Sequence, residues 1–333
     1  MRYWTPFNKP GLAGEELRPK RWSLLLAMLL AAVLLYLSVR GVEWGRVWRT
    51  IASADWPYVA VAAGFTMLTF FLRALRWRIL LNAEARFGVG TVFWANSAGY
   101  LGNSFLPARA GEFIRSFIIS SRSTLSNTYV LTTALGERLM DAIALVLWSS
   151  LVLVGVNPKP HWMEDVSRSM AILAGAGALA VMVLPHTGGL LKSVVQRAPL
   201  PLRVRSVVLG LSEQVLQGLR AFHDWRRFAG FVCLTVIVWM GDSLGAIACG
   251  RALGIGLSFR VAMLLLAGLG LSSALPSTPG YVGIYQFVAV TVLTPFGVSR
   301  DGALAYILVM QALGYAVVLL FGLPALYKLQ RGK

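Results

Sequence analysis

Charged residues are scarce in this chain. They make up 14% of its 333 residues, whereas soluble domains carry about 25%. Hydrophobic residues make up 57%, and the mean hydropathy is +0.67. A chain of this composition cannot cover its surface with polar groups in water. We therefore exclude a soluble fold and expect an all-α integral membrane protein, since helices satisfy their own backbone hydrogen bonds in lipid.

Histidine and cysteine are also rare, with three and two residues. The histidines, His161, His186 and His223, lie far apart without the spacing of a zinc site. Cys233 and Cys249 share one apolar run, so no disulfide is expected between them. The sequence contains no recognisable nucleophile motif or phosphate-binding loop. We expect no metal, no cofactor and no catalytic domain.

Acidic residues number 14 against 31 lysines and arginines, which gives a net charge of +17 and a pI of about 10.6. In a soluble protein this excess would indicate nucleic acid as a partner. Here the basic residues lie mainly in short loops between apolar runs, which is typical of topology signals and of contacts with anionic lipid headgroups. Membrane lipids are therefore the expected partners, and nucleic acid is not.

A helix needs about 20 apolar residues to cross the hydrocarbon core. Six stretches qualify as full spans: 22–39, 57–73, 126–154, 169–185, 228–248 and 303–326. No small-residue cleavage site follows Val39, so the first stretch is interpreted as an uncleaved anchor. Residues 1–21 then form a cytoplasmic segment, and 22–333 form a single membrane domain.

Two further apolar regions, 91–120 and 260–296, are broken near their middle by proline and glycine. The breaks are Leu106-Pro-Ala-Arg-Ala-Gly111 and Leu275-Pro-Ser-Thr-Pro-Gly280. Each half is too short to span, and proline removes a backbone donor and clashes with the preceding turn. We expect both regions to bend back as re-entrant helical hairpins.

The distribution of basic residues predicts the orientation. With the N-terminus inside, the inside segments carry 22 Lys and Arg and the outside segments carry 8. This excess favours cytoplasmic N- and C-termini in the cell (inner) membrane. The inside loop 186–227 contains an amphipathic stretch with apolar residues at helical spacing. It would lie on the inner leaflet or pack on the cytoplasmic face of the bundle.

The two halves of the chain have the same order of elements. Residues 57–154 contain a span, a broken hairpin and a span, and so do residues 228–326. In the predicted topology the first unit begins outside and the second begins inside. Such inverted repeats with broken helices are the architecture of many alternating-access carriers.

Ionisable residues at membrane depth are costly unless they are paired, so they mark candidate functional sites. Six of them lie in the first hairpin and the start of the next span: Arg109, Glu112, Arg115, Glu137, Arg138 and Asp141. Their charges sum to zero. They could form a polar binding site for a zwitterionic or anionic headgroup. Alternatively, they could form structural ion pairs that join the hairpin to the next span. The two interpretations stay open.

The second hairpin offers hydroxyls and backbone amides at a helix start, in Ser277, Thr278, Gly280 and Gly283. Half-helix N-termini attract anionic groups, but a tight, satisfied turn also explains these residues and is slightly favoured. Asp242 is the remaining acid within a span. It could carry a coupling proton or make a simple helix contact.

Three motifs carry a resemblance to a known family. They are Asn103-Ser-Phe-Leu-Pro-Ala-Arg-Ala-Gly-Glu112-Phe-Ile-Arg115, Glu137-Arg-Leu-Met-Asp141 and Leu275-Pro-Ser-Thr-Pro-Gly280-Tyr-Val-Gly283. In this order they resemble the membrane region of lysylphosphatidylglycerol synthases, which also occurs in stand-alone, flippase-like proteins. The resemblance covers nearly the whole chain beyond residue 20. It implies movement of aminoacylated phospholipids, or of polyprenyl-linked or hopanoid lipids.

The chain departs from the family pattern at two positions. Gln286 and Gln311 stand where the family commonly has Glu and Arg. Both replacements are neutral, which suggests that an amide contact has replaced an ion pair. The fused synthases carry a soluble aminoacyl-transferase domain, and we expect none here because the chain ends at Lys333.

The leading hypothesis is a lipid flippase that works by alternating access, with no enzymatic activity. Its substrate would be an anionic or zwitterionic phospholipid or a polyprenyl-linked lipid. A membrane-embedded transferase would instead use Glu112, Glu137 and Asp141 for acid/base chemistry. A scaffold for a lipid-modifying enzyme is the third hypothesis. The sequence leaves a homo-oligomer open.

Overall fold

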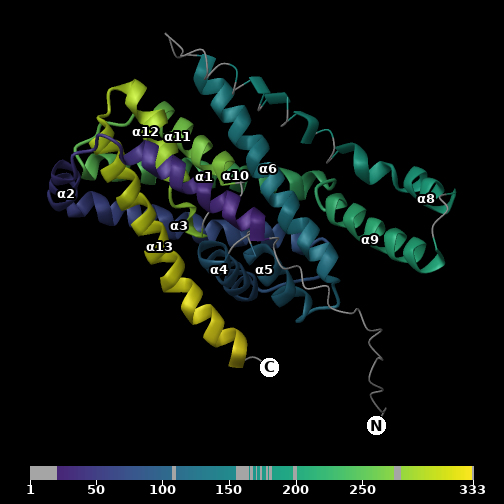
Figure 1. Cartoon of the computed structure of the whole chain (residues 1–333). Coiled ribbons are helices and arrows are strands. Elements are labelled where there is room, and N and C mark those ends of the chain that lie inside the picture. The colour runs from purple at the N-terminus through teal and green to yellow at the C-terminus, as the bar shows by residue number, and fades with distance from the viewer. Residues whose placement is uncertain are drawn as a thin grey trace.

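The computed structural model describes residues 21–106, 110–154, 182–197, 201–273 and 279–331, together with 165, 168–169, 171–172, 175–177 and 179. The described part is helical and contains no strand. Its elements are α1 (Arg21–Val39), α2 (Trp44–Ala52), α3 (Trp56–Leu81), α4 (Val89–Phe105), α5 (Gly111–Ser120), α6 (Asn127–Val154), η2 (Leu184–His186), α8 (Gly188–Arg197), α9 (Leu202–Arg220), α10 (Trp225–Ala252), α11 (Phe259–Ser272), η3 (Pro279–Tyr281), α12 (Ile284–Leu293), η4 (Thr294–Phe296) and α13 (Arg300–Arg331). Figure 1 shows them as one bundle.

Three helices of the described part, α3, α10 and α13, are long and apolar enough to cross a membrane, or four spans result if the bent pair α1 and α2 counts as one. α3, α10 and α13 contain 26, 28 and 32 residues, which at about 1.5 Å per residue exceeds a hydrocarbon core of about 30 Å. The predicted span 126–154 is the 28-residue helix α6, which carries three of the predicted charges. Much of 169–185 lies outside the described residues. The count of six spans stays a prediction.

Residues 40–56 belong to the segments counted as outside in the predicted topology, and they are not irregular throughout. They contain the amphipathic helix α2, which is bent by 83° from α1. Val47 is buried against the bundle, whereas Trp44 and Trp48 are exposed. Exposed tryptophans on a short amphipathic helix are typical of the membrane–water interface.

Helix α3 is longer than its predicted span. Pro57 occupies its first turn, where the missing N–H costs nothing. The helix then continues past Arg73, where the apolar stretch ends, as far as Leu81. The count of inside basic residues includes those of segment 73–90, and with them Arg73 and Arg76. In the structure both residues lie within α3, and carboxylates on neighbouring helices pair both guanidiniums. Paired cations are tolerated inside a helical bundle.

The predicted break of the first hairpin is present. Leu106 ends α4 in an extended conformation (φ −104°, ψ 146°), as expected for a residue that precedes proline. α5 begins at Gly111 and packs back against α4. A side chain at Gly111 would overlap the Gly99 carbonyl, so only glycine allows the two helices to approach this closely.

The second predicted hairpin also consists of two packed helices, α11 and α12. Residues 274–278, which include the first four residues of the predicted break, lie outside the described residues. Ser258 caps α11 by accepting a hydrogen bond from the Val261 N–H at 3.3 Å. At the start of α12, Gly283 adopts a φ of +90°, and a side chain there would overlap the Ala31 carbonyl on α1. Glycine therefore allows the turn at this point.

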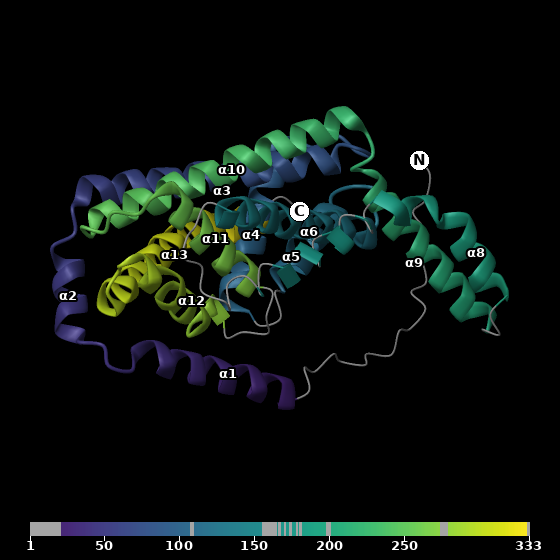
Figure 2. The same ribbon diagram turned by 90° about the horizontal axis from the view of Figure 1, so that it is seen from above.

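Helices α3 and α10 pack along much of their length and lie side by side at one edge of the bundle (Figure 2). Gly241 and Gly245 on α10 face α3, and a Cβ atom on Gly241 would lie 2.7 Å from the Thr69 methyl carbon. Glycines four residues apart allow such close approach of membrane helices. This contact brings Arg73 of α3 next to Asp242 of α10.

The predicted amphipathic stretch of loop 186–227 is helix α9, which packs against α6 and buries Leu216 and Leu219. The prediction that this stretch packs on the bundle is therefore confirmed for the face that carries Leu216 and Leu219. Val207 and Leu211 on the other side of α9 are exposed. Helices α8 and α9 project beyond the rest of the bundle in both ribbon views (Figures 1 and 2).

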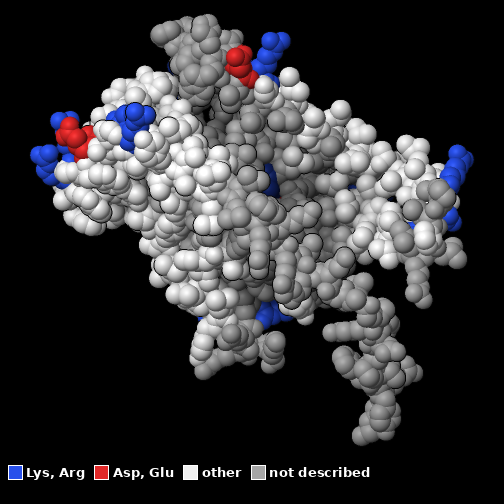
Figure 3. Space-filling model, viewed as in Figure 1, with Lys and Arg blue, Asp and Glu red and all other residues white. Residues whose placement is uncertain are grey.

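In Figure 3 the face of the bundle is largely free of charge, and charged residues gather at its margins.

Candidate functional site

Arg76 joins three helices through a buried network of charges. Its Nη1 donates to Asp141 Oδ1 at 2.6 Å, and its Nη2 donates to Glu137 Oε1 at 2.8 Å and to Asp141 Oδ2 at 2.8 Å. Nη1 also donates to the Thr235 hydroxyl on α10 at 3.2 Å. The Phe231 ring lies 5.0 Å from the guanidinium carbon. The partners hold α3, α6 and α10 together around a charge that would be costly if unpaired.

Arg115 extends this network into α5. It donates to Glu112 Oε2 at 2.6 Å, to Glu137 Oε2 at 2.9 Å and to Asn96 Oδ1 at 2.9 Å. Its guanidinium carbon lies 4.4 Å from the centre of the Trp77 ring. Glu137 therefore accepts from arginines of two helices, and α4, α5 and α6 meet at Arg115.

Arg138 completes the network from α6. Its Nε donates to Glu112 Oε1 at 2.9 Å, and its Nη1 lies 3.7 Å from Asp141 Oδ2. Its Nη2 donates to the Tyr100 hydroxyl at 3.3 Å, and the Tyr100 ring lies 5.4 Å from the guanidinium carbon. Three arginines and three carboxylates thus form one network without net charge. The cost of removing one member depends on how many partners its neighbours keep and on how deeply they are buried.

A second ion pair lies beside this network, between Arg73 on α3 and Asp242 on α10. The Trp239 ring lies 5.4 Å from the Arg73 guanidinium carbon. The Trp239 indole N–H is buried and has no acceptor among the described residues.

The exposure of the side chains separates the arginines into two groups. The Arg76 and Arg115 side chains are 0% and 2% exposed, whereas those of Arg138 and Arg73 are 19% and 17% exposed. Only the second group can contact a ligand without unfolding the network.

Arg73 and Arg138 both line a cavity of about 410 Å³. Its walls come from α3, α4, α6, α10, α11, η3, α12 and α13. The polar lining residues include Asn103, Asp141, Asp242, Tyr100 and Gln311, and most of the remaining lining is apolar. The volume is within the range of about 300–1,000 Å³ for small-molecule sites.

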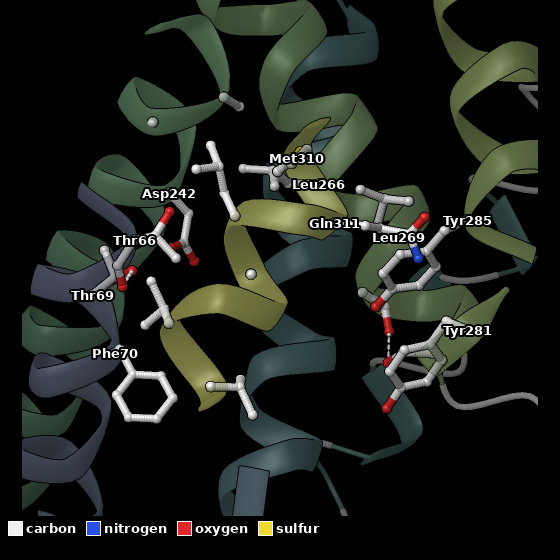
Figure 4. Close-up of a pocket in the computed structure, with 18 of the residues that line it drawn as sticks. Thr66, Thr69, Phe70, Asp242, Leu266, Leu269, Tyr281, Tyr285, Met310 and Gln311 are labelled. Carbon is white, nitrogen blue, oxygen red and sulfur yellow. Dashed lines mark hydrogen bonds between the residues drawn. The ribbon is translucent and has the colours of Figure 1, made fainter. Parts of the chain in front are cut away.

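The two sides of the cavity differ in chemistry (Figure 4). Asp242, Thr66 and Thr69 lie on one side, and Tyr281, Tyr285 and Gln311 lie on the other. Leu266, Leu269 and Met310 also contribute to the wall. The cavity therefore combines a charged side, an apolar wall and a neutral polar side, as an amphiphilic ligand requires.

The neutral side is built around two glutamines. Gln286 Nε2 donates to Gln311 Oε1 at 2.6 Å, and Gln286 Oε1 accepts from the Gly283 N–H at 2.7 Å. Gln311 Nε2 donates to the Gly280 carbonyl at 3.1 Å, which also accepts a hydrogen bond from the Tyr315 hydroxyl. The amide contact expected from the sequence is present, and it fixes the turn before α12 to α13.

The structure divides the predicted site residues into three groups. Those that line the cavity are Arg138, Asp141, Asp242, Gly280 and Gln311. Those that lie outside the cavity lining and support it are Glu112, Arg115, Glu137, Gly283 and Gln286. Arg109, Ser277 and Thr278 lie outside the described residues. Asp242 makes an ion pair with Arg73, and the predicted proton coupling is not tested by this geometry.

The sequence analysis missed Arg73, Arg76, Tyr100 and Trp239. The signal for the arginines was available, because Phe70-Phe-Leu-Arg-Ala-Leu-Arg-Trp-Arg-Ile-Leu-Leu81 keeps its apolar residues between the cations. Arg73 and Arg76 are three residues apart and so lie on one helical face. Tyr100 and Trp239 carry no such signal, since aromatic residues are common throughout membrane helices.

The described residues contain no group of three or more His, Cys, Asp or Glu side chains that could hold a metal ion. The chemistry of the site is that of guanidinium, carboxylate, amide and phenol groups beside an apolar wall. Guanidinium groups bind phosphate and carboxylate through paired hydrogen bonds.

Comparison with known proteins gives the family. The family model of the lysylphosphatidylglycerol synthase TM region matches residues 24–322. Glycosyltransferase AglD of Haloferax volcanii is 24% identical to the chain over 93% of the chain and 55% of the relative, so the chain spans about half the length of this relative. A UPF0104 membrane protein of Methanothermobacter thermautotrophicus is 23% identical over 93% of the chain and 94% of the relative. A second one from the same organism is 22% identical over 83% of the chain and 85% of the relative.

The family model covers most of the chain, and both the apolar helices and the membrane-protein relatives agree with it. The resemblance that the three motifs predicted is therefore confirmed. The chain is a multi-pass integral membrane protein and belongs to the family of the lysylphosphatidylglycerol synthase transmembrane region.

Proposed function

We propose that this protein moves a lipid with an anionic or zwitterionic headgroup between the leaflets of the cell membrane. The cavity receives the headgroup, and the acyl or prenyl chains remain in the surrounding bilayer. The observation that carries the proposal is the pair of partly exposed arginines, Arg73 and Arg138, which face one cavity with an otherwise largely apolar wall.

The ion pairs suit transient binding of a phosphate. Both arginines already have carboxylate partners, Asp242 for Arg73 and Glu112 for Arg138. A phosphate that enters the cavity competes with these carboxylates, so it binds weakly enough to leave again. A carrier needs such balanced affinity in both of its conformations.

The proposal includes the finer architecture expected from the sequence. Six spans and two re-entrant hairpins, α4–α5 and α11–α12, would form inverted repeats that rock about the cavity. The packing of α5 on α6 and of α11 on both α6 and α12 supports this arrangement. Both termini lie in the cytoplasm in this topology. The substrate would be a phospholipid or a polyprenyl-linked lipid.

Reconstitution into liposomes tests the proposal. Fluorescent lipids with phosphate-bearing headgroups are placed in the inner leaflet, and their arrival in the outer leaflet is followed by chemical quenching. Wild-type protein should accelerate the exchange, and the Arg73→Gln/Arg138→Gln double variant should abolish most of this acceleration. Arg251→Gln is the matched control, because Arg251 is exposed at the end of α10 and does not line the cavity. Equal rates for liposomes with and without protein would overturn the proposal.

A membrane-embedded transferase is the second candidate, favoured by the similarity to glycosyltransferase AglD. Of the three carboxylates that the sequence suggested for acid/base chemistry, Asp141 lines the cavity, whereas Glu112 and Glu137 lie behind it in ion pairs. Asp141 would then act as the base that activates a lipid-linked acceptor. Purified protein incubated with a polyprenyl phosphate and nucleotide sugars should form a glycolipid if this candidate is correct, and Asp141→Asn should remove the activity.

A further inference from the structure

We propose that the neutral side of the cavity binds a sugar, so that the transported headgroup is a glycosyl phosphate carried on a lipid chain. This inference rests on the proposed lipid transport and names its substrate class. It depends on four features of the neutral side: a pair of stacked tyrosines, a strained backbone, an amide with unused hydrogen-bonding capacity, and the position opposite the charged side.

The stacked pair consists of Tyr281 and Tyr285. Their ring centres lie 4.8 Å apart with an interplanar angle of 8°, and both residues line the cavity (Figure 4). A parallel pair offers the outer face of a ring rather than an aromatic cage of crossed rings. The face of an aromatic ring carries negative charge density, and the C–H bonds on one face of a sugar ring are positively polarised. Stacking of a sugar on the tyrosine face therefore fits this geometry better than enclosure of a quaternary ammonium group.

The backbone at Tyr281 is strained. Its φ of +60° is the one left-handed value of a non-glycine residue in the described part of the chain. Bulky side chains adopt this conformation at a cost, and such strain tends to occur at functional sites. Glycines on either side of it, Gly280 and Gly283, adopt positive φ at no such cost. A tyrosine between them indicates that the ring is needed at this place.

Gln311 supplies hydrogen-bonding groups beside the rings. An amide can donate two hydrogen bonds and accept two. The described contacts of Gln311 are a hydrogen bond to the Gly280 carbonyl, one accepted from Gln286 and one with the Tyr315 hydroxyl. The second acceptor position of its Oε1 atom matches a sugar hydroxyl, which can donate. The described residues placed on this side, Tyr281, Tyr285, Gln311 and Tyr315, are neutral, as suits an uncharged sugar.

The charged side completes the match. Arg73 and Arg138 belong to the same cavity as the tyrosines. A phosphate held at this side would leave the sugar to extend toward Tyr281 and Tyr285, and the lipid chain would follow the apolar wall.

Equilibrium binding separates this inference from the transport proposal. Purified protein in lipid nanodiscs is titrated with farnesyl phosphate, with farnesyl phosphoryl glucose and with glucose 1-phosphate, and binding is followed by native mass spectrometry. We expect the glycosylated lipid to bind at least about tenfold tighter than farnesyl phosphate, as an added hydrogen bond and a stacked ring would give. Glucose 1-phosphate should bind more weakly than either lipid.

Two variants and one control complete the experiment. In the Tyr285→Leu and Tyr281→Gly variants, the affinities for the two lipids should differ by less than about twofold. The two binding free energies would then be nearly equal. Tyr281→Gly also relieves the backbone strain, so its thermal midpoint should not fall, and a loss of sugar preference would not reflect unfolding. Tyr36→Leu is the control, since Tyr36 is 60% exposed and does not line the cavity.

The possible results are distinguishable. Equal affinities of wild-type protein for both lipids would overturn the sugar site and leave lipid transport standing. An unchanged preference in both tyrosine variants would also overturn it. Tight binding of glucose 1-phosphate would show that the sugar phosphate need not be lipid-linked, which contradicts the proposed substrate. Absence of binding by every lipid would overturn both this inference and the proposed function.

Discussion

Arg76 on α3 holds Asp141 on α6 through two hydrogen bonds of 2.6 and 2.8 Å, and Asp141 lines the cavity. The wall of the cavity is thus anchored directly to the buried network of charges. Arg76 itself is fully buried and does not reach the cavity. The two residues divide the network into a part that supports the site and a part that faces a ligand, and the predictions below depend on this division.

Substitution of Arg76 should destabilise the protein more than any substitution at the surface of the cavity. Arg76→Met leaves Glu137 and Asp141 with a buried charge that has lost its main partner. We expect the free energy of unfolding to fall by about 3–5 kcal/mol. Unfolding in detergent or bicelles measures this, with Arg251→Met as an exposed control that should change stability by about 0.5 kcal/mol or less. Equal stability of the two variants would show that the network is not structural.

Arg138→Gln should affect transport more than stability. The Arg138 side chain is 19% exposed, and Glu112 keeps Arg115 as a second partner when Arg138 is lost. We expect lipid exchange to slow by at least about tenfold, equivalent to about 1.4 kcal/mol. The loss of stability should be well below that of Arg76→Met. If both variants lose the same stability and transport falls only in proportion to folded protein, the role of Arg138 is structural.

Asp242→Asn tests whether this carboxylate restrains Arg73 or carries a proton. The substitution leaves Arg73 without its opposing charge. Because that charge competes with the phosphate, we expect anionic lipids to bind about tenfold tighter and to be released more slowly, so that exchange falls. The dissociation constant is measured by native mass spectrometry of protein in nanodiscs. Unchanged affinity together with loss of stimulation by a pH gradient would instead favour a coupling proton on Asp242.

The contact between α4 and α5 should not tolerate a larger residue at Gly102. A Cβ atom there would lie 2.7 Å from the Ile114 Cδ1 atom and 2.9 Å from the Gly111 Cα atom. The backbone of Gly111 cannot give way without moving α5, so Gly102→Ala should destabilise the protein by about 1–3 kcal/mol. Gly64→Ala is the control, because the position within α3 is open and alanine should be neutral or stabilising by up to about 1 kcal/mol. Equal effects of the two substitutions would contradict the close packing of α4 on α5.

The acids of α6 and the broken apolar regions could be predicted from the sequence for simple physical reasons. Charges are rare in membrane helices, so Glu137 and Asp141 stand out, and prolines interrupt helices wherever they occur. The extended conformation of Leu106 follows directly from Pro107. These features depend on neighbours in the sequence.

The partners of these acids could not be predicted in the same way. Arg76 follows an apolar run and looks like a positive-inside signal until Glu137 and Asp141 are found beside it, about 60 residues later in the chain. The amphipathic helix α2 was missed because nine residues give a weak periodic signal. The contact of Gln311 with Gly280 depends on how α13 packs beside the turn before α12, and the sequence does not encode that packing locally.

The central claim is that a lipid headgroup occupies the cavity, and photo-cross-linking tests it most directly. A phospholipid with a diazirine on its headgroup is incorporated into nanodiscs with the protein, activated by light, and its attachment sites are mapped by mass spectrometry. The account predicts attachment to residues of the cavity wall such as Thr66, Leu266 and Met310, and loss of this attachment in the Arg73→Gln/Arg138→Gln variant. Attachment confined to the outer face, at residues such as Leu147, Leu320 and Leu323, which are 65%, 53% and 56% exposed, would contradict it.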